Sequence, residues 1–366
     1  MTSFSELTTM RVGGPISRYV AYSSTRTLIS GAKKIWADSD DWMALGSGSN
    51  LVVSDSGFDG DVIHVQTRGV TVKKATGQRV SIHAEAGEDW DAFVAHTLAQ
   101  GVRGLETLSG IPGTVGASVI QNIGAYGSEV SDTIESIDFL EYPTGVRRTV
   151  LAEELELGLR TSALKTGKLR GLVLGVTFSL EPADEGVSIP ILYDQLAATM
   201  GVQSGDRAPL DAVRPTVRSI RASKGMLLSE EDPDSVSSGS FFLNPLVTEK
   251  ISLSLPQEAP RWLVGDQQQD RVVPLEAGTP DDVTFSEPGL VKISAAWLIE
   301  YSGIPKGFSL PGSRAAISSK HSLAITNRGG ASSGDIGELA RYVITTVGNK
   351  TGIYLVPEPT LLGIEL

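Results

Sequence analysis

Hydrophobic and polar residues near the start of the chain follow two distinct periods. Alternation of apolar and polar side chains predicts strands at Ser17–Ala21, Trp42–Leu45 and Asp61–Gln66. Between the first two strands, a helical period runs from Thr25 to Asp38, with Ser24 or Thr25 as the expected N-cap. These elements predict a small α+β unit.

Strand and helix patterns continue to alternate over residues 70–180. Strands are predicted at Val80–Ala86, Ser136–Tyr142 and Leu172–Leu180. The segment Asp89–Gln100 repeats its apolar residues with the period of about 3.6 that a helix requires. This stretch therefore predicts a second unit of mixed strands and helices.

The last part of the chain predicts a third unit. Helices are expected at 211–222, near Ala295–Tyr301 and near Gly334–Thr346, and a closing strand is expected at Gly352–Val356. A chain of 366 residues can bury several cores, so two or three domains are expected. The fold class predicted for the whole chain is α+β.

Charged residues gather just before and within a polar loop at 225–240. The acidic run Glu230–Asp234 is interpreted as the solvated part of this loop. A basic cluster precedes the loop and indicates either a site for an anionic small ligand or a solvated helix face. Its members are Arg214, Arg218, Arg221 and Lys224.

Composition excludes several classes of protein. There are no cysteines, which excludes disulfides, thiolate nucleophiles and Fe–S ligation. No segment approaches the run of about 18 apolar residues that crosses a bilayer, and the N-terminal segment lacks the apolar stretch of a signal peptide. The net charge of −12 argues against nucleic acid as a partner. We therefore expect a cytoplasmic protein without membrane insertion.

Two small-residue loops suggest a phosphate-bearing ligand. Ser109–Ala117 carries glycines at three-residue intervals, and Gly46–Asn50 is a second such loop. Glycine permits positive φ and close backbone approach, so backbone N–H groups can point at a phosphate. Each loop alone could be an ordinary turn. Together they suggest a cofactor that carries two phosphates.

Other common chemistries find no support in the sequence. The first loop is not a Gly-x-Gly-x-x-Gly fingerprint, because Leu51 stands at its last position. No nucleotide-binding Gly-x-x-x-x-Gly-Lys-Ser/Thr loop and no Gly-x-Ser-x-Gly motif is present. The four histidines show no metal-ligand spacing, so no metal is expected. His64 and His83 lie within predicted strands and are interpreted as structural.

Four further short stretches are too specific in type to be explained by packing alone. They are Gly158–Lys165, Arg221–Lys224, Gly239–Pro245 and Val356–Pro359. With them, the chain resembles the UDP-N-acetylenolpyruvoylglucosamine reductase family over nearly its whole length. The matching features occur in the family's order: Thr8–Gly14, Gly46–Asn50, Ser109–Gly116, Gly124–Gly127, Arg160, Lys224, Ser240–Pro245, Lys320–His321 and Glu358.

The resemblance implies three α+β domains. The first two would form an FAD-binding fold of the vanillyl-alcohol oxidase type, at residues 1–69 and 70–222. The third, at 223–356, would bind substrate, and the C-terminal residues 357–366 are a candidate addition to the first.

The resemblance also implies the reaction. NADPH would reduce non-covalently bound FAD, which would deliver hydride from N5 to C3 of UDP-N-acetylglucosamine enolpyruvate. Arg160 matches the position that stabilises the enolate, and Ser240 matches the proton donor to C2. An arginine fork suits a carboxylate, while a serine needs a strongly basic carbanion. Glu358 matches the third catalytic position, where it must be protonated or held back by Arg160, since an ionised carboxylate would repel the enolate.

The remaining implied contacts concern cofactor and substrate. The diphosphate and flavin would lie against Gly46, Ser47, Gly48, Ser49, Asn50, Ser109, Gly113, Thr114, Gly116, Gly124 and Ala125. The uridine diphosphate portion would contact Tyr193, Lys224 and Asn244. Tyr193 points to the form of the family with a tyrosine-bearing lid, and a monomer is expected.

Two other functions remain open at this stage. A flavin-dependent oxidase or dehydrogenase of a hydroxy acid or sugar would share the glycine loops but not the ordered set of Arg160, Ser240 and Glu358. A non-catalytic protein that binds a nucleotide sugar or a flavin would need the loops without the acid and the anion-stabilising group.

Overall fold

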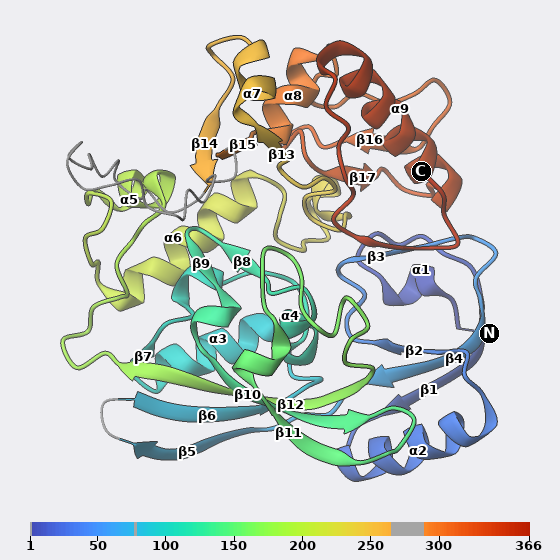
Figure 1. Cartoon of the computed structure of the whole chain (residues 1–366), viewed down its shortest axis with the longest axis vertical. Coiled ribbons are helices and arrows are strands. Elements are labelled where there is room, and N and C mark those ends of the chain that lie inside the picture. Colours follow the sequence, from blue (N-terminus) through green and yellow to red (C-terminus); the bar gives the residue numbers. More distant parts are fainter. Residues whose placement is uncertain (1, 77–78, 265–288) are drawn as a thin grey trace, which may run out of the picture.

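The computed structural model describes residues 2–76, 79–264 and 289–366. Figure 1 shows two lobes: the larger sheets lie in the lower one, and the last helices with two small sheets lie in the upper one. The predicted α+β class is confirmed. None of the helices in the described ranges has the length and apolar character that a bilayer crossing requires.

Helices and strands follow one another irregularly along the chain. The helices are α1 Phe4–Leu7, α2 Thr25–Asp38, α3 Trp90–Ala99, α4 Val115–Ile120, α5 Asp194–Met200, α6 Leu210–Ser223, α7 Glu249–Ser254, α8 Ala295–Tyr301 and α9 Ser333–Thr351. The strands are β1 Ile16–Tyr22, β2 Trp42–Leu45, β3 Leu51–Val53, β4 Phe58–Val65, β5 Val70–Thr76, β6 Arg79–Glu85, β7 Val102–Arg103, β8 Gly124–Ala125, β9 Ser128–Glu129, β10 Ile134–Glu141, β11 Arg147–Leu151, β12 Gly171–Pro182, β13 Leu246–Thr248, β14 Arg261–Val264, β15 Leu290–Ile293, β16 Ala315–Ile317, β17 Ile325–Asn327 and β18 Thr360–Leu362.

A parallel sheet of order β1-β4-β2 carries the first glycine loop at one edge. The predicted strands and the predicted helix α2 are confirmed, and Ser24 is the N-cap, because its side chain accepts from the N–H of Thr27. Leu45 at the end of β2 is buried in the core beneath this sheet. Because β2 ends at this buried residue, the glycine loop that begins at Gly46 has a rigid support.

The second sheet is antiparallel in the order β11-β10-β12-β6-β5, and β7 also pairs with β12. Its strand β12 is buried along most of its length, as its run of apolar residues on both faces requires. The Phe93 ring of α3 packs on the Phe178 ring of β12, with centroids 4.9 Å apart. The Nε1–H of Trp90 donates to the carbonyl of Leu108 at 3.0 Å, which fixes the approach to the second glycine loop.

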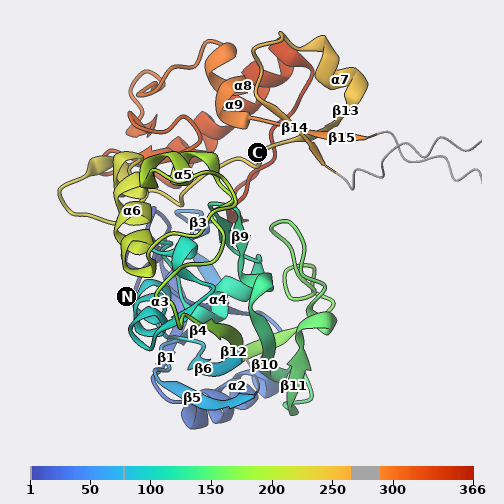
Figure 2. The same ribbon diagram turned by 90° about the vertical axis from the view of Figure 1, so that its left-hand side faces the viewer.

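Helices α5 and α6 lie at one side of the molecule, between the two lobes (Figure 2). The predicted helix at 211–222 is confirmed as α6, and the segment 225–240 is a loop as predicted, except for one short 3-10 turn at Pro233–Ser235. Helix α6 packs against the 3-10 turn Glu106–Leu108, directly before the second glycine loop. This contact links the basic cluster of α6 to the cofactor loops.

The third core lies beneath α8 and α9 and takes residues from both ends of the chain. Met10, Val12 and Val52 belong to this core, although they lie far from α8 and α9 in the sequence. The Nδ2–H of Asn327 donates to the carbonyls of Met10 and Arg11 at 3.1 and 3.3 Å. The domain boundaries at 69/70 and 222/223 stay predictions.

The prediction of a strand at Gly352–Val356 is wrong, because these residues form no strand. Helix α9 continues to Thr351 and ends at Gly352, whose φ of +73° lies in the left-handed region that favours glycine. The residues after it lie beside Leu243, whose N–H donates to the carbonyl of Val356 at 2.9 Å. Prolines at 357 and 359 have no N–H to donate, so this contact does not extend into a ladder.

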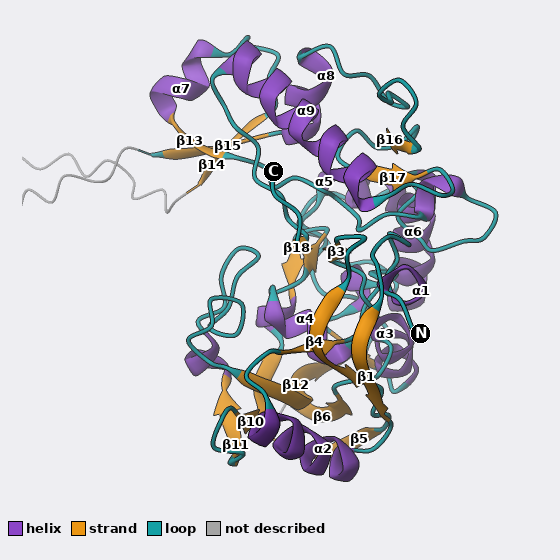
Figure 3. Ribbon diagram, turned by 90° about the vertical axis from the view of Figure 1, so that its right-hand side faces the viewer, coloured by secondary structure: helices purple, strands orange, loops and turns teal. Residues whose placement is uncertain are grey.

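The closing strand lies further along, as β18, and pairs in parallel with β3 (Figure 3). The N–H of Thr360 donates to the carbonyl of Asn50 at 2.9 Å, where the first glycine loop ends. This pairing brings the segment that contains Glu358 to the cofactor loops.

Candidate active site

The two glycine loops predicted from sequence meet in space. Both line one cavity of about 370 Å³. A Cβ added to Gly46 would lie 2.7 Å from Oγ1 of Thr114, so the loops touch through a position that has no room for a side chain. Gly113 also faces the first loop, since a Cβ added there would make an ordinary contact with Oγ of Ser49 at 3.5 Å.

The first loop presents unused donors to the cavity. Gly48 has a φ of +61°, and an added Cβ there would lie 2.4 Å from the carbonyl oxygen of Leu7. Within the described residues, the N–H groups of Ser47, Gly48 and Ser49 donate to no backbone or side-chain acceptor. The hydroxyl of Ser47 is buried and has no hydrogen-bond partner there either. Such a run of free N–H groups fits a phosphate.

The other predicted cofactor residues are divided between two cavities and the protein interior. Asn50, Thr114 and Gly124 line the first cavity, and Gly116 lines a second one of about 180 Å³. Ser109 is fully buried, and its hydroxyl donates to the carbonyl of Glu106 at 2.7 Å. Ala125 lines neither cavity; it lies in the short β8–β9 pairing directly after Gly124.

The second cavity adjoins the first and is mainly apolar. Gly46 and Thr114 line both cavities, so the two form one continuous site around the glycine loops. The wall of the second cavity includes Trp42, Leu172 and Val173. The combined site therefore has an apolar end, a middle lined by the two glycine loops and a polar end.

The three predicted catalytic residues line the polar end of the first cavity. Nε of Arg160 donates to Oε1 of Glu358 at 3.0 Å, although the two residues are 198 positions apart. The other nitrogens of Arg160 donate to the carbonyls of Asn122 at 3.2 Å and Gly124 at 2.6 Å. These three bonds fix the plane of the guanidinium.

Glu358 and Ser240 are both connected to the buried residue Phe241, Ser240 as its neighbour in the chain and Glu358 through a hydrogen bond. The N–H of Glu358 donates to the carbonyl of Phe241 at 2.9 Å, and the N–H of Phe241 donates to the carbonyl of Leu323 at 2.7 Å. Phe241 and Phe242 are buried, which anchors Ser240 at the cavity wall. The positions of Glu358 and Ser240 are therefore fixed by main-chain hydrogen bonds and by the buried side chains beside them.

The electrostatics of this end are set by burial. Burial raises the pKa of Glu358 above its usual range, while Arg160 and Lys165 oppose the shift. Burial lowers the pKa of Lys165, with Glu358 acting in the opposite direction. A carboxyl that is poorly solvated and next to two cations can change its protonation when a ligand rearranges those cations.

The predicted substrate residues lie outside the walls of these two cavities. Tyr193 precedes α5 and packs edge-on against Tyr126, with ring centroids 5.4 Å apart. Nζ of Lys224 donates to Oε1 of Gln195 at 2.8 Å, and Oδ1 of Asn244 accepts from the N–H of Ala295 at 2.9 Å.

The basic cluster of α6 is committed to partners within the protein. Arg214 and Arg218 both form ion pairs with Asp91 of α3. Arg221 is only 8% exposed, and its Nε donates to the carbonyl of Gly110 at 3.0 Å. The interpretation as a solvated helix face is therefore wrong for Arg221, which is buried and lines the first cavity, whereas a site for an anionic small ligand at this cluster stays a prediction.

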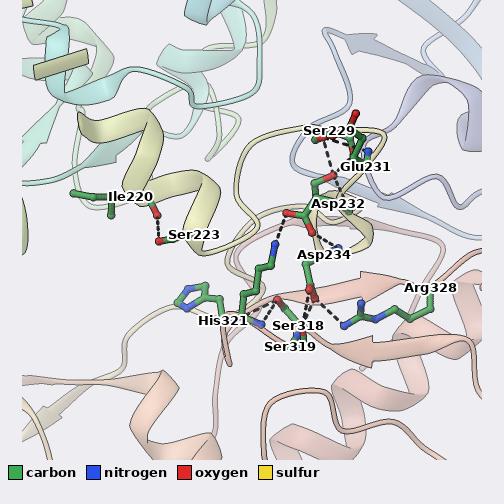
Figure 4. Close-up of polar contacts among 12 residues, drawn as sticks. Ile220, Ser223, Ser229, Glu231, Asp232, Asp234, Ser318, Ser319, His321 and Arg328 are labelled. Carbon is green, nitrogen blue, oxygen red and sulfur yellow. Dashed lines mark hydrogen bonds and ion pairs between the residues drawn. The ribbon is translucent and has the colours of Figure 1, made fainter. Parts of the chain in front are cut away.

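The acidic run Glu230–Asp234 is solvated only in part: Glu230 and Glu231 are exposed as predicted, whereas Asp232 and Asp234 bind partners within the protein (Figure 4). Asp234 is 3% exposed and accepts from Arg328 at 2.7 Å, and from the N–H and Oγ of Ser319 at 2.8 and 2.6 Å. Asp232 accepts from Nζ of Lys320 at 2.9 Å. The run instead ties the loop before Ser240 to the β16–β17 hairpin.

His64 and His83 contact neighbouring strands, which agrees with their interpretation as structural residues. Nδ1 of His64 lies 2.6 Å from the hydroxyl of Tyr19, and Nδ1 of His83 lies 3.1 Å from Oγ1 of Thr177. Both side chains bridge neighbouring strands and are structural. In the described part of the chain, no group of three or more acidic or histidine side chains is placed to hold a metal.

Two residues of the site escaped the sequence analysis. Lys165 lines the cavity and lies at the end of a motif that was recognised, but it was assigned no role. Asn122 is 1% exposed; its side chain donates to Glu129 and to the carbonyl of Gly158. No local pattern distinguishes a buried asparagine of this kind, so only the fold reveals it.

Comparisons with known proteins agree on the class of the chain. Residues 16–150 match the family model described as FAD binding domain, and residues 232–362 match the UDP-N-acetylenolpyruvoylglucosamine reductase, C-terminal domain. A UDP-N-acetylenolpyruvoylglucosamine reductase from Leifsonia xyli subsp. xyli is 47% identical, covering 100% of this chain and 99% of that protein. One from Saccharopolyspora erythraea is 44% identical, covering 98% and 94%.

A solved structure shares the fold. The crystal structure of UDP-N-acetylenolpyruvylglucosamine reductase from Thermus caldophilus superposes with a TM-score of 0.62, over 99% of this chain and 97% of that one. The sequence identity is 23%, so this likeness concerns the fold alone.

Fold, glycine loops and family models together define an FAD-binding oxidoreductase. More narrowly, the chain belongs to the UDP-N-acetylenolpyruvoylglucosamine reductase family, which uses NADPH and acts in peptidoglycan precursor synthesis. The resemblance found in the sequence is confirmed at the level of the family.

The contact between the loops predicts the effect of Gly46→Ala. The added methyl group would push Thr114 away and separate the two loops, so we expect flavin to bind at least about tenfold more weakly. Absorbance of the purified protein gives its flavin content, and titration of the flavin-free protein gives the dissociation constant. Gly334→Ala is the control, since its added Cβ meets only Oγ of Ser332 at 3.4 Å. Equal flavin affinity in both variants would contradict the expectation.

His321 predicts a pH-dependent loss of stability. Burial first, and then Lys224 and Lys306, lower its pKa to about 4, while Glu300 acts in the opposite direction. The unfolded chain protonates this histidine below about pH 6.5, whereas the folded protein keeps it neutral to about pH 4. The unfolded state therefore binds more protons in this window, and stability falls as the pH drops through it.

His321→Asn removes this component. Thermal unfolding is measured at pH 7.5 and pH 5. Between these pH values the unfolding temperature of the wild-type protein should fall more than that of the variant. A difference in unfolding temperature that is the same at both pH values would rule out His321 as a source of acid sensitivity.

Proposed function

We propose that this chain reduces UDP-N-acetylglucosamine enolpyruvate to UDP-N-acetylmuramate, with Arg160, Ser240 and Glu358 as its catalytic residues. The observation that carries the proposal is their convergence. Three side chains from distant parts of the chain line the cavity that the two glycine loops also line. FAD, when bound there, would take hydride from NADPH and supply it to C3 of the substrate.

The glycine loops would hold the cofactor without a covalent bond. Free N–H groups at Ser47, Gly48 and Ser49 suit its diphosphate, since they are fixed by the fold and need no reorganisation. The apolar second cavity would accept the adenine, and Gly124 would lie near the flavin ring. Residues Ser109 and Ala125 would act by shaping these loops.

Arg160 would stabilise the negative charge that develops on the substrate. Its guanidinium is held by two main-chain carbonyls and by Glu358, so it points into the cavity before any ligand arrives. Donors that are oriented in advance lower the barrier because they pay no reorganisation during the reaction. A bidentate contact with the enolpyruvyl carboxylate would place C3 and C2 at defined positions.

Ser240 would donate the proton to C2. Gly239 before it has a φ of +79°, and Phe241 and Phe242 after it are buried, so the hydroxyl stands on a fixed backbone. A serine hydroxyl is a weak acid, and it can act here only because the adjacent carbanion is strongly basic and the geometry is set.

Glu358 would change its protonation on substrate binding. In the free protein it pairs with Arg160 at 3.0 Å. A substrate carboxylate that takes over part of this guanidinium leaves Glu358 with less positive charge and with the burial that raises its pKa. Glu358 would then take up a proton, and it would not repel the enolate.

Several finer features belong to the same proposal. Tyr193, packed against Tyr126, would act as the tyrosine-bearing lid, and Lys224 and Asn244 would reach the uridine diphosphate after exchanging their present partners. The protein would work as a monomer in the cytoplasm, without nucleic acid or a membrane as a partner. The net charge of −12 supports the absence of polyanionic partners.

Replacing Ser240 by alanine separates the two halves of the reaction. Flavin reduction by NADPH should stay near normal, whereas reoxidation by the enolpyruvyl substrate should slow by about 10²–10⁴-fold, because one positioned proton transfer is lost. Anaerobic stopped-flow absorbance of the flavin measures both rates. Ser254→Ala, on the surface helix α7, is the control. Reoxidation at the wild-type rate would remove Ser240 from the mechanism.

The choice of substrate tests the function as a whole. NADPH-reduced protein mixed anaerobically with UDP-N-acetylglucosamine enolpyruvate should return to oxidised flavin and yield UDP-N-acetylmuramate. Rapid reduction of the oxidised flavin by a hydroxy acid or a sugar, with no turnover of the enolpyruvyl compound, would favour an oxidase or dehydrogenase. Flavin that binds but is reduced neither by NADPH nor by a hydroxy acid or sugar would favour a binding protein.

A further inference from the structure

Arg160 occupies a backbone position that is unfavourable for arginine. Gly158 and Thr161 close a tight turn around it, with N–H···O bonds of 3.1 and 3.2 Å in both directions. Arg160 is the third residue of this turn and has a φ of +53°. This position favours glycine or asparagine, because a side chain there costs about 1 kcal/mol or more. Because the left-handed conformation is unfavourable for arginine, contacts with neighbouring residues must stabilise the backbone of Arg160.

The contact that holds this residue comes from Lys165. Its Nζ donates to the main-chain carbonyl of Arg160 at 2.9 Å. The backbone of Lys165 is itself anchored, since its N–H donates to Oγ of Ser162 at 3.1 Å, and Ser162 in turn donates to the carbonyl of Ile120 at 2.5 Å. The ammonium group thus fixes the peptide that follows the strained φ angle.

Lys165 also contributes charge to the polar end of the cavity. It lines the cavity together with Arg160 and Glu358. Its positive charge and that of Arg160 both oppose the effect of burial on Glu358. Of the other charged groups nearby, Glu129 accepts from the side chain of Asn122 beneath Arg160, and Arg221 is committed to the carbonyl of Gly110.

We propose that Lys165 is a positioning residue for the reaction: it locks the main chain of Arg160 in its left-handed conformation and supplies the second cation that faces Glu358. This inference rests on the proposed function, because it assigns Lys165 a role only through the two residues placed there. Lys165 does not touch the reacting atoms. It determines where the guanidinium points and how readily Glu358 takes up a proton.

Lys165→Met tests both parts, since it keeps the aliphatic chain and removes the donor and the charge. Reoxidation of the flavin by substrate should slow by about tenfold to hundredfold through misplacement of Arg160, while reduction by NADPH stays near the wild-type rate. The limb of the reoxidation pH profile that Glu358 controls should move to higher pH, because a cation that favours the carboxylate is gone.

Three companion variants make the result specific. Lys165→Arg keeps a charged donor and should restore the pH limb, and Lys165→Gln keeps a donor alone and should show the shifted limb with part of the rate recovered. Lys168→Met, on the same loop but lining neither cavity and paired with Glu156, should match the wild-type protein in both readouts. Flavin content and unfolding temperature verify that each variant is folded.

The outcomes separate this inference from the proposed function. A Lys165→Met profile that overlays the wild-type profile overturns the role of Lys165, even if Ser240→Ala still slows reoxidation. A pure loss of rate with an unmoved pH limb in Lys165→Met refutes the charge contribution. If Lys165→Met fails to fold, the pH limbs of Lys165→Gln and Lys165→Arg are compared, and identical limbs count against the proposal.

Discussion

The ion pair between Arg160 and Glu358 is the interaction on which the site depends. It joins residues 198 positions apart, and their side chains are only 21% and 16% exposed. Removing one member of a partly buried pair leaves a poorly solvated charge without its partner, which is more costly than losing a surface pair. The turn at Gly158–Thr161, the β8 segment and the β18 strand all converge on this contact. The active site is therefore also a junction of the fold.

The sequence predicted best what is local and periodic. Helix α2 and strand β2 have the bounds that their patterns indicated, and α8 does as well. The two glycine loops could be recognised because closely spaced glycines indicate positive φ angles and close approach of the backbone to a ligand. Their contact, at Gly46 and Thr114, follows from the fold and was anticipated only through a ligand that would need both.

The proposed catalytic residues can be recognised from the sequence by resemblance and not by a local pattern. A lone Arg160 or Glu358 carries no local signal, because its meaning depends on a partner far away in the chain. The closing strand was misplaced for a similar reason: apolar residues after Gly352 resemble a strand, but the helix extends to the glycine and the following prolines prevent a ladder.

Buried charges were the least predictable feature. Asp234 and Arg221 look like solvated residues in the sequence, since charge normally marks the surface. Both are buried because distant segments supply their partners, Arg328 and Ser319 for the first and the carbonyl of Gly110 for the second. Pairing of this kind has no periodicity, and only the assembled chain reveals it.

The third core has an evolutionary consequence. Because Met10, Val12 and Val52 pack into it beside residues of α9, its hydrophobic interior is assembled from segments at opposite ends of the gene. Recombination that exchanged only the C-terminal half of the gene between diverged relatives would combine α9 from one protein with core residues near Met10 and Val52 from another. The two sets of side chains would then not be matched in shape. We therefore expect the two halves to be inherited together, with compensating changes between them, and not to be shuffled as cassettes.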